Sequence, residues 1–316
     1  MDDNNAVEVR SEQTRNYWFR YLAECNMCGA STGSARVLGL RLDKSQGRNP
    51  RSKRGVAVTV CRCAQCGLIF ADPQPIPRSI SDHYNLPPEG YWRSVSFDPA
   101  PGYFEREVRT ALRLLGFREG LKAIDVGIGL GKATRVMRDA GFDVHGLEPS
   151  EPFFRKAMSL LGADDTRFQH ATIEEAKFDQ GAFDFISFGA VLEHLYNPSG
   201  ALAKAMSWLK PNGVVFAEVP NSNHLVSRII NTYYRFVGTN FITNTSPMHV
   251  PYHLFEFAPD SFRKNGKRAG YALVEYSIEV ASIYNIPRLL HPLLRTVMSR
   301  SETGMQLTVW LRKNDA

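Results

Sequence analysis

An apolar run that ends in an acid and a series of alternating glycines constrains this chain most. The stretch is Leu121–Thr134, LKAIDVGIGLGKAT. Residues 121–126 predict a buried strand with Asp125 at its end, and residues 132–140 predict the helix that follows. The turn between them contains Gly127, Gly129 and Gly131. Because glycine tolerates positive φ and lets a ligand approach the backbone closely, this stretch predicts the first strand and ligand loop of a nucleotide-type site.

The spacing of the glycines distinguishes two kinds of ligand. A dinucleotide-binding loop has the pattern G-x-G-x-x-G, but the residue after Gly131 is Lys132, so that pattern fails. The observed D-x-G-x-G-x-G resembles the first motif of class I S-adenosylmethionine (SAM) dependent methyltransferases. A second predicted strand, residues 143–147, ends in Glu148, where such folds place the acid that accepts hydrogen bonds from both ribose hydroxyls. Glu148 alone would be an ordinary surface acid; beside the glycine run it predicts a SAM site.

The resemblance to class I methyltransferases continues to about residue 221. Strands and helices alternate from residue 121 on, which predicts a Rossmann-like α/β core; the resemblance implies a mostly parallel seven-stranded sheet. The strand 183–188 ends in Phe188, which we assign to the cofactor site, and V-L-E-H-L-x-x-P follows it as in the family. The segment that contacts adenine in the family corresponds to residues 171–176, without the usual acid. This departure leaves the adenine contacts to backbone groups, at Thr172 for example, or to Glu174.

Two cysteine knuckles give the second strong signal. Cys25 and Cys28 precede Gly29, and Cys63 and Cys66 precede Gly67, so the motif C-x-x-C-G occurs twice. Four thiolates complete the tetrahedral set that Zn²⁺ requires. Disulfides are the alternative, but no N-terminal segment resembles a secretion signal, which favours a structural zinc site with Cys61 as a spare cysteine.

The predicted domain organisation follows from these two signals. We expect a zinc-binding module at 1–77, a linker and lead-in helix at 78–120, and a methyltransferase domain at 121–316 with a lid insert at 222–257. Prolines at 73, 75 and 77 predict an irregular linker. The aromatic segment 78–101, with His83, Tyr84, Tyr91 and Trp92, is expected to cover the cofactor or to pack. An apolar helical stripe in the insert, around Ile229 to Val237, would roof the pocket, dock on an apolar substrate or pack in the core.

The insert also concentrates groups that handle protons: His249, Tyr252, His253 and Glu256. A zinc module joined to this core resembles the bacterial sugar C-methyltransferases that act on nucleotide-linked deoxy-keto sugars, in a short form without their extra C-terminal domain. In that family a histidine before an aromatic and a small residue is the base, which implies His253 here. Histidine titrates near neutral pH, as a base requires. His249 is the second candidate, and Tyr252 or Glu256 would orient either; a purely structural role for both histidines is the alternative.

Composition bounds the function. Hydrophobic residues make up 43% of the chain, which suits a globular core, and no run of 18 apolar residues exists. Without a secretion signal we expect a cytoplasmic protein. The net charge of +6 is scattered in short clusters, so there is no strong nucleic-acid signal.

The expected function is SAM-dependent methyl transfer to a small molecule, a sugar or sugar nucleotide by resemblance, at carbon or oxygen. Two other acceptor classes stay open: a lipid-like or polyketide molecule, and RNA or protein. A third interpretation is a non-catalytic interaction protein that binds SAM and zinc. The sequence leaves the acceptor, the methylated atom and the oligomeric state undetermined.

Overall fold

The structure is a computed structural model that describes residues 7–9, 17–43, 55–78, 99–162, 166–281, 283 and 286–314. The predicted aromatic cover at residues 83–92 lies outside these ranges, as does most of the basic loop between the two knuckles. Within the described ranges, no helix is both long and apolar enough to cross a membrane.

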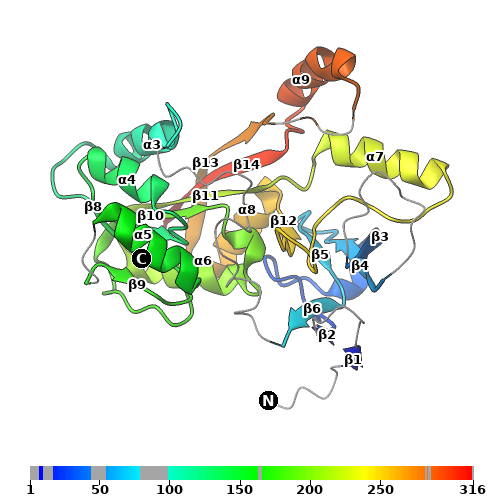
Figure 1. The fold of residues 1–316 in the computed structure, drawn as a ribbon, viewed down its shortest axis with the longest axis horizontal. Helices are drawn as coiled ribbons and strands as arrows, with labels where there is room; N and C mark the ends of the chain where they lie inside the picture. The colour runs from blue at the N-terminus through cyan, green and yellow to red at the C-terminus, as the bar shows by residue number, and fades with distance from the viewer. Residues whose placement is uncertain are drawn as a thin grey trace.

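A seven-stranded sheet forms the centre of the larger part of the molecule, in the order β13-β14-β11-β10-β7-β8-β9 (Figure 1). Its strands are β7 (Lys122–Val126), β8 (Asp143–Leu147), β9 (Phe168–Gln169), β10 (Phe183–Gly189), β11 (Leu209–Pro220), β13 (Tyr271–Glu279) and β14 (Gln306–Lys313). Five neighbours from β9 to β11 are parallel, whereas β14 runs antiparallel to both β11 and β13. This confirms the predicted Rossmann-like fold with a mostly parallel seven-stranded sheet.

Alternating side chains of the strands divide the core into two layers. The helices are α3 (Glu105–Leu115), α4 (Lys132–Asp139), α5 (Glu151–Leu161), α6 (Pro198–Trp208) and α8 (Pro259–Ala269). On β11, Phe216 packs with buried residues of α3 and α4, whereas Val215 and Ala217 pack with α6 and α8. Successive side chains of the strand thus point to opposite faces, and both faces are apolar, as a strand covered by helices on both sides requires.

The N-terminal part builds a second, four-stranded sheet, in the order β12-β5-β4-β3. Its strands are β3 (Arg36–Leu42), β4 (Ala57–Arg62), β5 (Ile69–Ala71) and β12 (Phe255–Glu256). β12 belongs to the predicted insert, yet it pairs antiparallel with β5, with Phe255 opposite Phe70. The insert is thus held by the N-terminal sheet, and the predicted boundary at residue 77 does not separate two independent sheets.

The proline run forms a strand, so the prediction of an irregular linker at residues 73–77 was wrong. β6 (Gln74–Pro77) pairs antiparallel with β2 (Tyr17–Arg20), which also pairs with β1 (Val7–Val9). The sheet order β1-β2-β6 leaves β6 at an edge. An edge strand tolerates proline where the missing N–H would point away from the partner strand.

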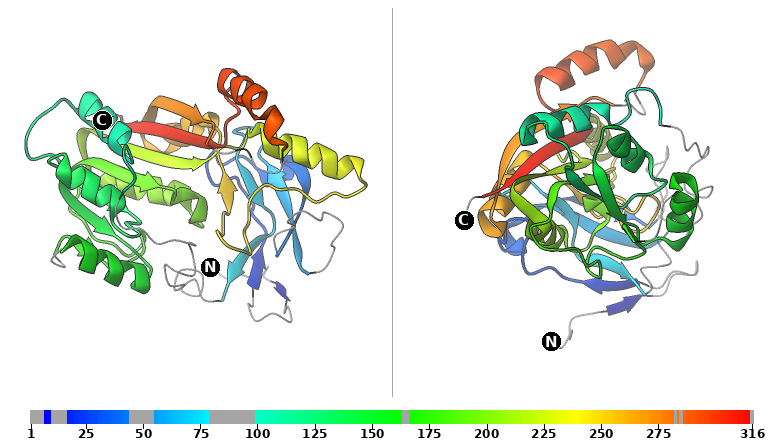
Figure 2. Two further views of the ribbon diagram at one scale, coloured as in Figure 1. Left: turned by 45° about the horizontal axis from the view of Figure 1, so that its top comes forward. Right: turned by 90° about the vertical axis from the view of Figure 1, so that its left-hand side faces the viewer.

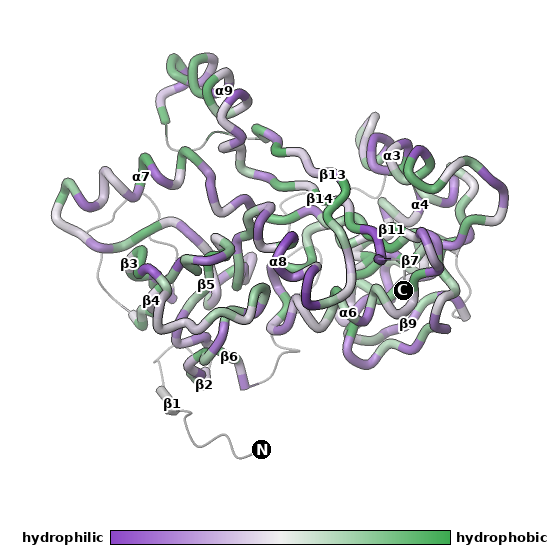
Figure 3. Tube along the Cα trace, turned by 180° about the vertical axis from the view of Figure 1, so that it is seen from behind, coloured by the Kyte–Doolittle hydropathy of each residue, from purple (hydrophilic) through white to green (hydrophobic). Residues whose placement is uncertain are grey.

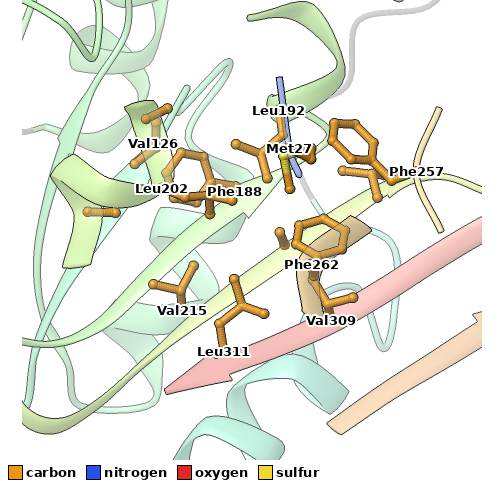
Figure 4. Close-up of a cluster of buried hydrophobic side chains, with 14 of the residues drawn as sticks. Met27, Val126, Phe188, Leu192, Leu202, Val215, Phe257, Phe262, Val309 and Leu311 are labelled. Carbon is orange, nitrogen blue, oxygen red and sulfur yellow. The ribbon is translucent and has the colours of Figure 1, made fainter. Parts of the chain in front are cut away.

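One hydrophobic core joins the knuckles to the central sheet. Met27, between the first two cysteines, is fully buried and belongs to the same cluster as Phe257, Phe262 and Val309. Figure 4 shows Met27 beside these side chains. The small N-terminal module therefore gains its core by sharing that of the methyltransferase domain.

Two further helices, α7 (Leu225–Phe236) and α9 (His291–Arg300), lie at the side of the molecule away from α4 and α5 (Figures 1 and 2). They contact each other through a small cluster that includes Val226 of α7 and Met298 of α9. The apolar stripe predicted for α7 is divided: Tyr234 is buried, whereas Tyr233 and Phe236 are exposed. In Figure 3, hydrophobic and hydrophilic stretches alternate along both helices.

Candidate active site and metal site

A cavity of about 710 Å³ lies at the carboxyl ends of β7, β8 and β10. Four residues predicted to bind the cofactor line it: Asp125, Gly127, Gly129 and Glu148. Phe153 of α5 and Val191 and Leu195, which follow β10, add apolar surface. This is the position at which open parallel sheets bind their ligands.

Glu148 is fixed by the loop it faces. Its two carboxylate oxygens accept hydrogen bonds from the backbone N–H of Gly129 and of Ser150, both at 2.9 Å. Burial raises the pKa of this carboxyl group to about 7. Each oxygen keeps a further lone pair, so a ribose diol fits this acid once it is ionised.

Asp125 links the strand before the glycine loop to the elements beside it. Its oxygens accept hydrogen bonds from the hydroxyls of Ser187, at 2.6 Å, and Thr134, at 2.7 Å. These contacts tie β7 to β10 and to α4. Burial raises the pKa of Asp125, and the two hydroxyls oppose that shift.

The three glycines have different tasks. A Cβ atom on Gly127 would come within 2.8 Å of Val191, and one on Gly131 within 2.8 Å of Leu161. A Cβ atom on Gly129, where φ is 55°, would be 4.0 Å from the nearest described atom, because this residue faces the cavity. Gly131 therefore serves the packing of α4 on α5 and does not line the cavity.

Two other predicted cofactor residues also lie outside the lining of this cavity. Thr172 donates both its hydroxyl and its backbone N–H to the carboxylate of Glu175, at 3.0 and 3.1 Å. Phe188 is fully buried in the core. The structure thus brings together the glycine loop and Glu148 but not Thr172 or Phe188.

A second cavity, of about 390 Å³, adjoins the first. We call it the acceptor cavity, and the first one the cofactor cavity. The two share Ala190, Glu218 and His253 in their linings. The rest of the acceptor cavity comes from the end of β11, from α7, from the insert and from the start of β14.

His253 stands where the two cavities meet. Its ring centroid is 4.9 Å from that of His194, and ligating atoms of Glu193, His194 and His253 all lie within 4.8 Å of one another. The Nδ1 atom of His194 donates to the carbonyl of Tyr252 at 3.3 Å, because a carbonyl oxygen can only accept. Burial, with the neighbouring histidines, lowers the pKa of His253 to about 3, so its ring is neutral at pH 7.

The other three predicted catalytic residues have different surroundings. Tyr252 is buried, and neither it nor His249 lines a cavity. The Nε2 atom of His249 accepts a hydrogen bond from the Arg41 guanidinium at 3.1 Å. Glu256 does line the acceptor cavity, but its two oxygens accept from Asn244 and from the backbone of Thr245, each at 2.7 Å. Glu256 therefore holds two parts of the insert together, the segment of Asn244 and Thr245 and the strand β12.

Sequence reasoning missed three titratable residues of the acceptor cavity: Glu193, Glu218 and His224. Burial raises the pKa of Glu193 to about 8 and that of Glu218 to about 7. Among the described residues, Glu193 Oε2 and His224 Nε2 are buried without a hydrogen-bond partner. Glu193 stands in the V-L-E-H-L motif, and Glu218 is close to the carboxyl end of β11. Both positions could therefore have been predicted as site residues.

The four predicted zinc ligands come together. The sulfur atoms of Cys25 and Cys66 are 3.6 Å apart, those of Cys28 and Cys63 are 3.5 Å apart, and all four lie within 4.8 Å of one another. Cys61 is outside this cluster. Zn–S bonds of ~2.3 Å in a tetrahedron separate the sulfurs by roughly 3.8 Å, which fits this arrangement. Burial raises the pKa of Cys28 to about 11, so a set of thiolates here calls for a cation.

Helix α8 of the methyltransferase domain holds both knuckles. The Asn265 side chain donates to the carbonyl of Met27 at 2.9 Å, and the Ser261 hydroxyl donates to the carbonyl of Cys66 at 3.1 Å. Gly29 and Gly67, with φ of 71° and 75°, close the knuckle turns as predicted. The cysteine cluster is thus part of the joint between the two sheets.

Comparison with known proteins supports the class that this fold and this cavity define. A family profile described as a methyltransferase domain matches residues 102–276. The chain therefore belongs to this methyltransferase domain family.

Individual relatives are more distant. The chain is 24% identical over 160 residues to a ubiquinone biosynthesis O-methyltransferase of Bordetella avium, a match that covers 50% of this chain and 64% of the relative. It is 32% identical over 130 residues to the protein of the same name from Bradyrhizobium diazoefficiens, which covers 40% and 49%. A solved SAM-dependent methyltransferase from Mesorhizobium loti matches with a TM-score of 0.47 and 17% identity, over 69% of this chain and 100% of the other. The chain thus spans less than two thirds of these curated relatives.

Proposed function

We propose that this protein transfers the methyl group of SAM to a small molecule bound in the acceptor cavity. One observation carries the proposal: the cofactor cavity and the acceptor cavity meet at Ala190, Glu218 and His253. A ligand in each would therefore face the other at this junction. Holding two reactants in line is the main contribution that a protein makes to such a transfer.

The residues of the chain have separable roles in this proposal. SAM, when bound, supplies an activated methyl group. Glu148 holds the ribose, and Gly129 gives the cofactor room. His253, neutral at pH 7, accepts the proton that the acceptor hydroxyl or acidic carbon must lose. Glu193, whose carboxyl group lies within 4.8 Å of a His253 ring nitrogen, stabilises the imidazolium that results.

The assignment of His253 as the base is supported by its place at the junction. The low pKa makes His253 a weak base. An ionised carboxylate beside the ring raises the pKa of the imidazole and so makes it a stronger base. Glu193 and Glu218 both line the acceptor cavity and, with pKa values of about 8 and about 7, change charge near neutral pH. His249 is the weaker candidate, because its Nε2 is already engaged by Arg41.

For the acceptor, two classes are supported by different observations. The zinc module and the segment around His253 resemble those of sugar C-methyltransferases, which favours a sugar or sugar nucleotide. The names of the relatives favour a quinone precursor, methylated at oxygen. Both are small molecules with a group that must lose a proton.

The decisive experiment is to incubate the purified protein with methyl-labelled SAM and three acceptor pools: sugar nucleotides, quinone precursors and RNA. We expect label in one of the small-molecule pools and none in RNA. Label in RNA alone would refute the proposal. Tight SAM binding without label in any pool would favour the non-catalytic interpretation.

We also propose that the four clustered cysteines bind one structural Zn²⁺. Metal analysis of protein purified without chelators should give about one zinc per chain. Cys63→Ser should lose the metal and lower the melting temperature, while SAM affinity of the protein that remains folded stays within about twofold, because no cysteine lines the cofactor cavity. Two metals per chain would contradict the role of His253 as a base, since the Glu193, His194 and His253 group would then hold the second.

A further inference from the structure

Large apolar side chains are exposed on α7, on α9 and on the short 3-10 helix η3 (Arg288–Leu290) that leads into α9. Phe236 is 89% exposed, Leu289 90% and Leu293 64%. Ile229, Tyr233, Leu290 and Val297 are also exposed. Such a group on neighbouring helices is unusual for a surface that faces only water.

The charged residues of the segments that carry these side chains have one sign. The sequence contains 32 acidic residues among 316, yet none lies between Glu218 and Glu256 or between Glu279 and Glu302. These two stretches contain α7 and α9. They carry five arginines: Arg228, Arg235, Arg288, Arg295 and Arg300. At the end of the second stretch, Glu302 accepts a hydrogen bond from the Tyr276 hydroxyl of β13.

One of these helices, α7, borders the acceptor cavity. Val226 and Ile230, on the inner side of α7, line that cavity, together with His224 and Ser227 at the start of the helix. Val226 and Ile230 also pack in the small cluster with Met298 of α9. α7 therefore separates the acceptor cavity from the apolar, basic outer surface.

We propose that the outer surface of α7 and α9 docks on a membrane that contains anionic lipids. Helices of this kind, with apolar and basic side chains and no acid, lie in the interface of a bilayer, where burial of apolar groups and attraction to anionic headgroups add together. A second copy of the chain is a poorer occupant, because two such surfaces would bring arginines against arginines. The docking is independent of the proposed catalytic step. If both hold, the acceptor cavity opens beside the bilayer, which suits a lipid-like or lipid-linked acceptor.

The test is flotation of the full-length protein with vesicles of phosphatidylcholine alone or mixed with phosphatidylglycerol. We expect binding to the mixed vesicles that weakens at high salt, and little binding to phosphatidylcholine. The variant Leu289→Ser/Leu293→Ser should bind at least about tenfold more weakly, because each leucine buries several methylene groups in the bilayer. Arg288→Gln/Arg300→Gln should weaken binding by about tenfold as well.

The matched control is Phe117→Ser, which removes an apolar side chain that is 81% exposed and lies after α3, outside both helices. It should bind vesicles like the unmodified protein. All variants should keep their melting temperature and SAM affinity, since the replaced side chains are exposed. Equal binding of all variants, or loss of binding in Phe117→Ser alone, would overturn the proposal. So would a concentration-dependent dimer that the leucine variant abolishes while vesicle binding is absent.

Discussion

The cofactor cavity and the acceptor cavity meet, but the chain builds them in different ways. The cofactor cavity takes 11 of its 23 lining residues from one stretch, Asp125 to Phe153, which includes the glycine loop and Glu148. The titratable groups of the acceptor cavity, Glu193, Glu218, His224, His253 and Glu256, come from segments that are farther apart in sequence. A local motif can specify the cofactor loop, whereas only the complete fold brings the titratable groups of the acceptor cavity together.

The anchoring of the two cavities differs as well. The cofactor loop is held by hydrogen bonds from its own strand and neighbours, such as those of Asp125. The segment that carries His253 is held by β12, which pairs with β5 of the N-terminal module. Changes to the glycine loop should therefore reduce activity through cofactor binding, and changes at His253 should act mainly on turnover.

The largest expected effect is that of Gly129→Val. Positive φ disfavours a β-branched residue, and the new side chain would enter the cofactor cavity. Calorimetry should detect no SAM binding. Gly141→Val is the matched control: Gly141 also has positive φ, of 91°, but a Cβ atom there would meet no described atom within 4 Å, and the residue lies outside the cavity. Similar SAM affinity in both variants would show that the loop does not hold the cofactor.

His253→Ala should reduce turnover by about two to four orders of magnitude, the usual contribution of a positioned base. Its SAM affinity should change by less than about threefold, because Glu148 and the glycine loop remain. His249→Ala is the control from the same segment and should keep most of its activity. Normal turnover in His253→Ala, with an inactive His249→Ala, would move the base to His249 and contradict the assignment made from the cavity lining.

Glu148→Ala should weaken SAM binding by roughly 1.5 to 3 kcal/mol, the range for hydrogen bonds to a charged group. Glu151→Ala, next to Ser150 and exposed on α5, is a control that removes the same charge outside the cavity. The two affinities can be compared by calorimetry at pH 8, where Glu148 is ionised. Equal affinities would mean that the ribose does not contact Glu148.

These comparisons also show which features the sequence could predict. The glycine turn was predictable because neighbouring residues determine its geometry, and Glu148 because it directly follows an apolar strand. The cysteine cluster was predictable because each knuckle is a local turn and four thiols have few other partners. The strands β7, β8 and β10 and the helix α4 lie within one residue of their predicted bounds, since each buries a regular apolar face.

The features that sequence reasoning missed depend on distant contacts. The strand β6 forms among prolines because β2 offers a sheet edge. Phe188 was assigned to the cofactor from its position near the end of β10, but the alternation of that strand turns it into the core. Nothing local shows that Arg41 engages His249 or that Glu193 meets His253 across 60 residues.

The smallest expected effect concerns the pH dependence of stability. It depends on Glu193, which lines the acceptor cavity close to His253. Burial raises the folded-state pKa of Glu193 to about 8, above its ordinary value of 4.5. A raised carboxyl pKa contributes stability that is fully present below pH 4.5 and is lost as the pH rises through about 8. The low folded pKa of His253 acts in the opposite direction, but its contribution is lost only as the pH falls below 6.5. Between pH 6.5 and 8 the contribution of Glu193 therefore changes with pH whereas that of His253 does not.

In that window the contribution of Glu193 to the free energy of unfolding should decrease with pH. Glu193→Gln removes this contribution, so its slope should be more positive than that of the unmodified protein by up to about 1.4 kcal/mol per pH unit, the limit for one proton. Urea titrations at several pH values would measure both slopes. Equal slopes would contradict the raised pKa of Glu193, since the carboxyl group would then be ionised throughout this window in the folded state as well.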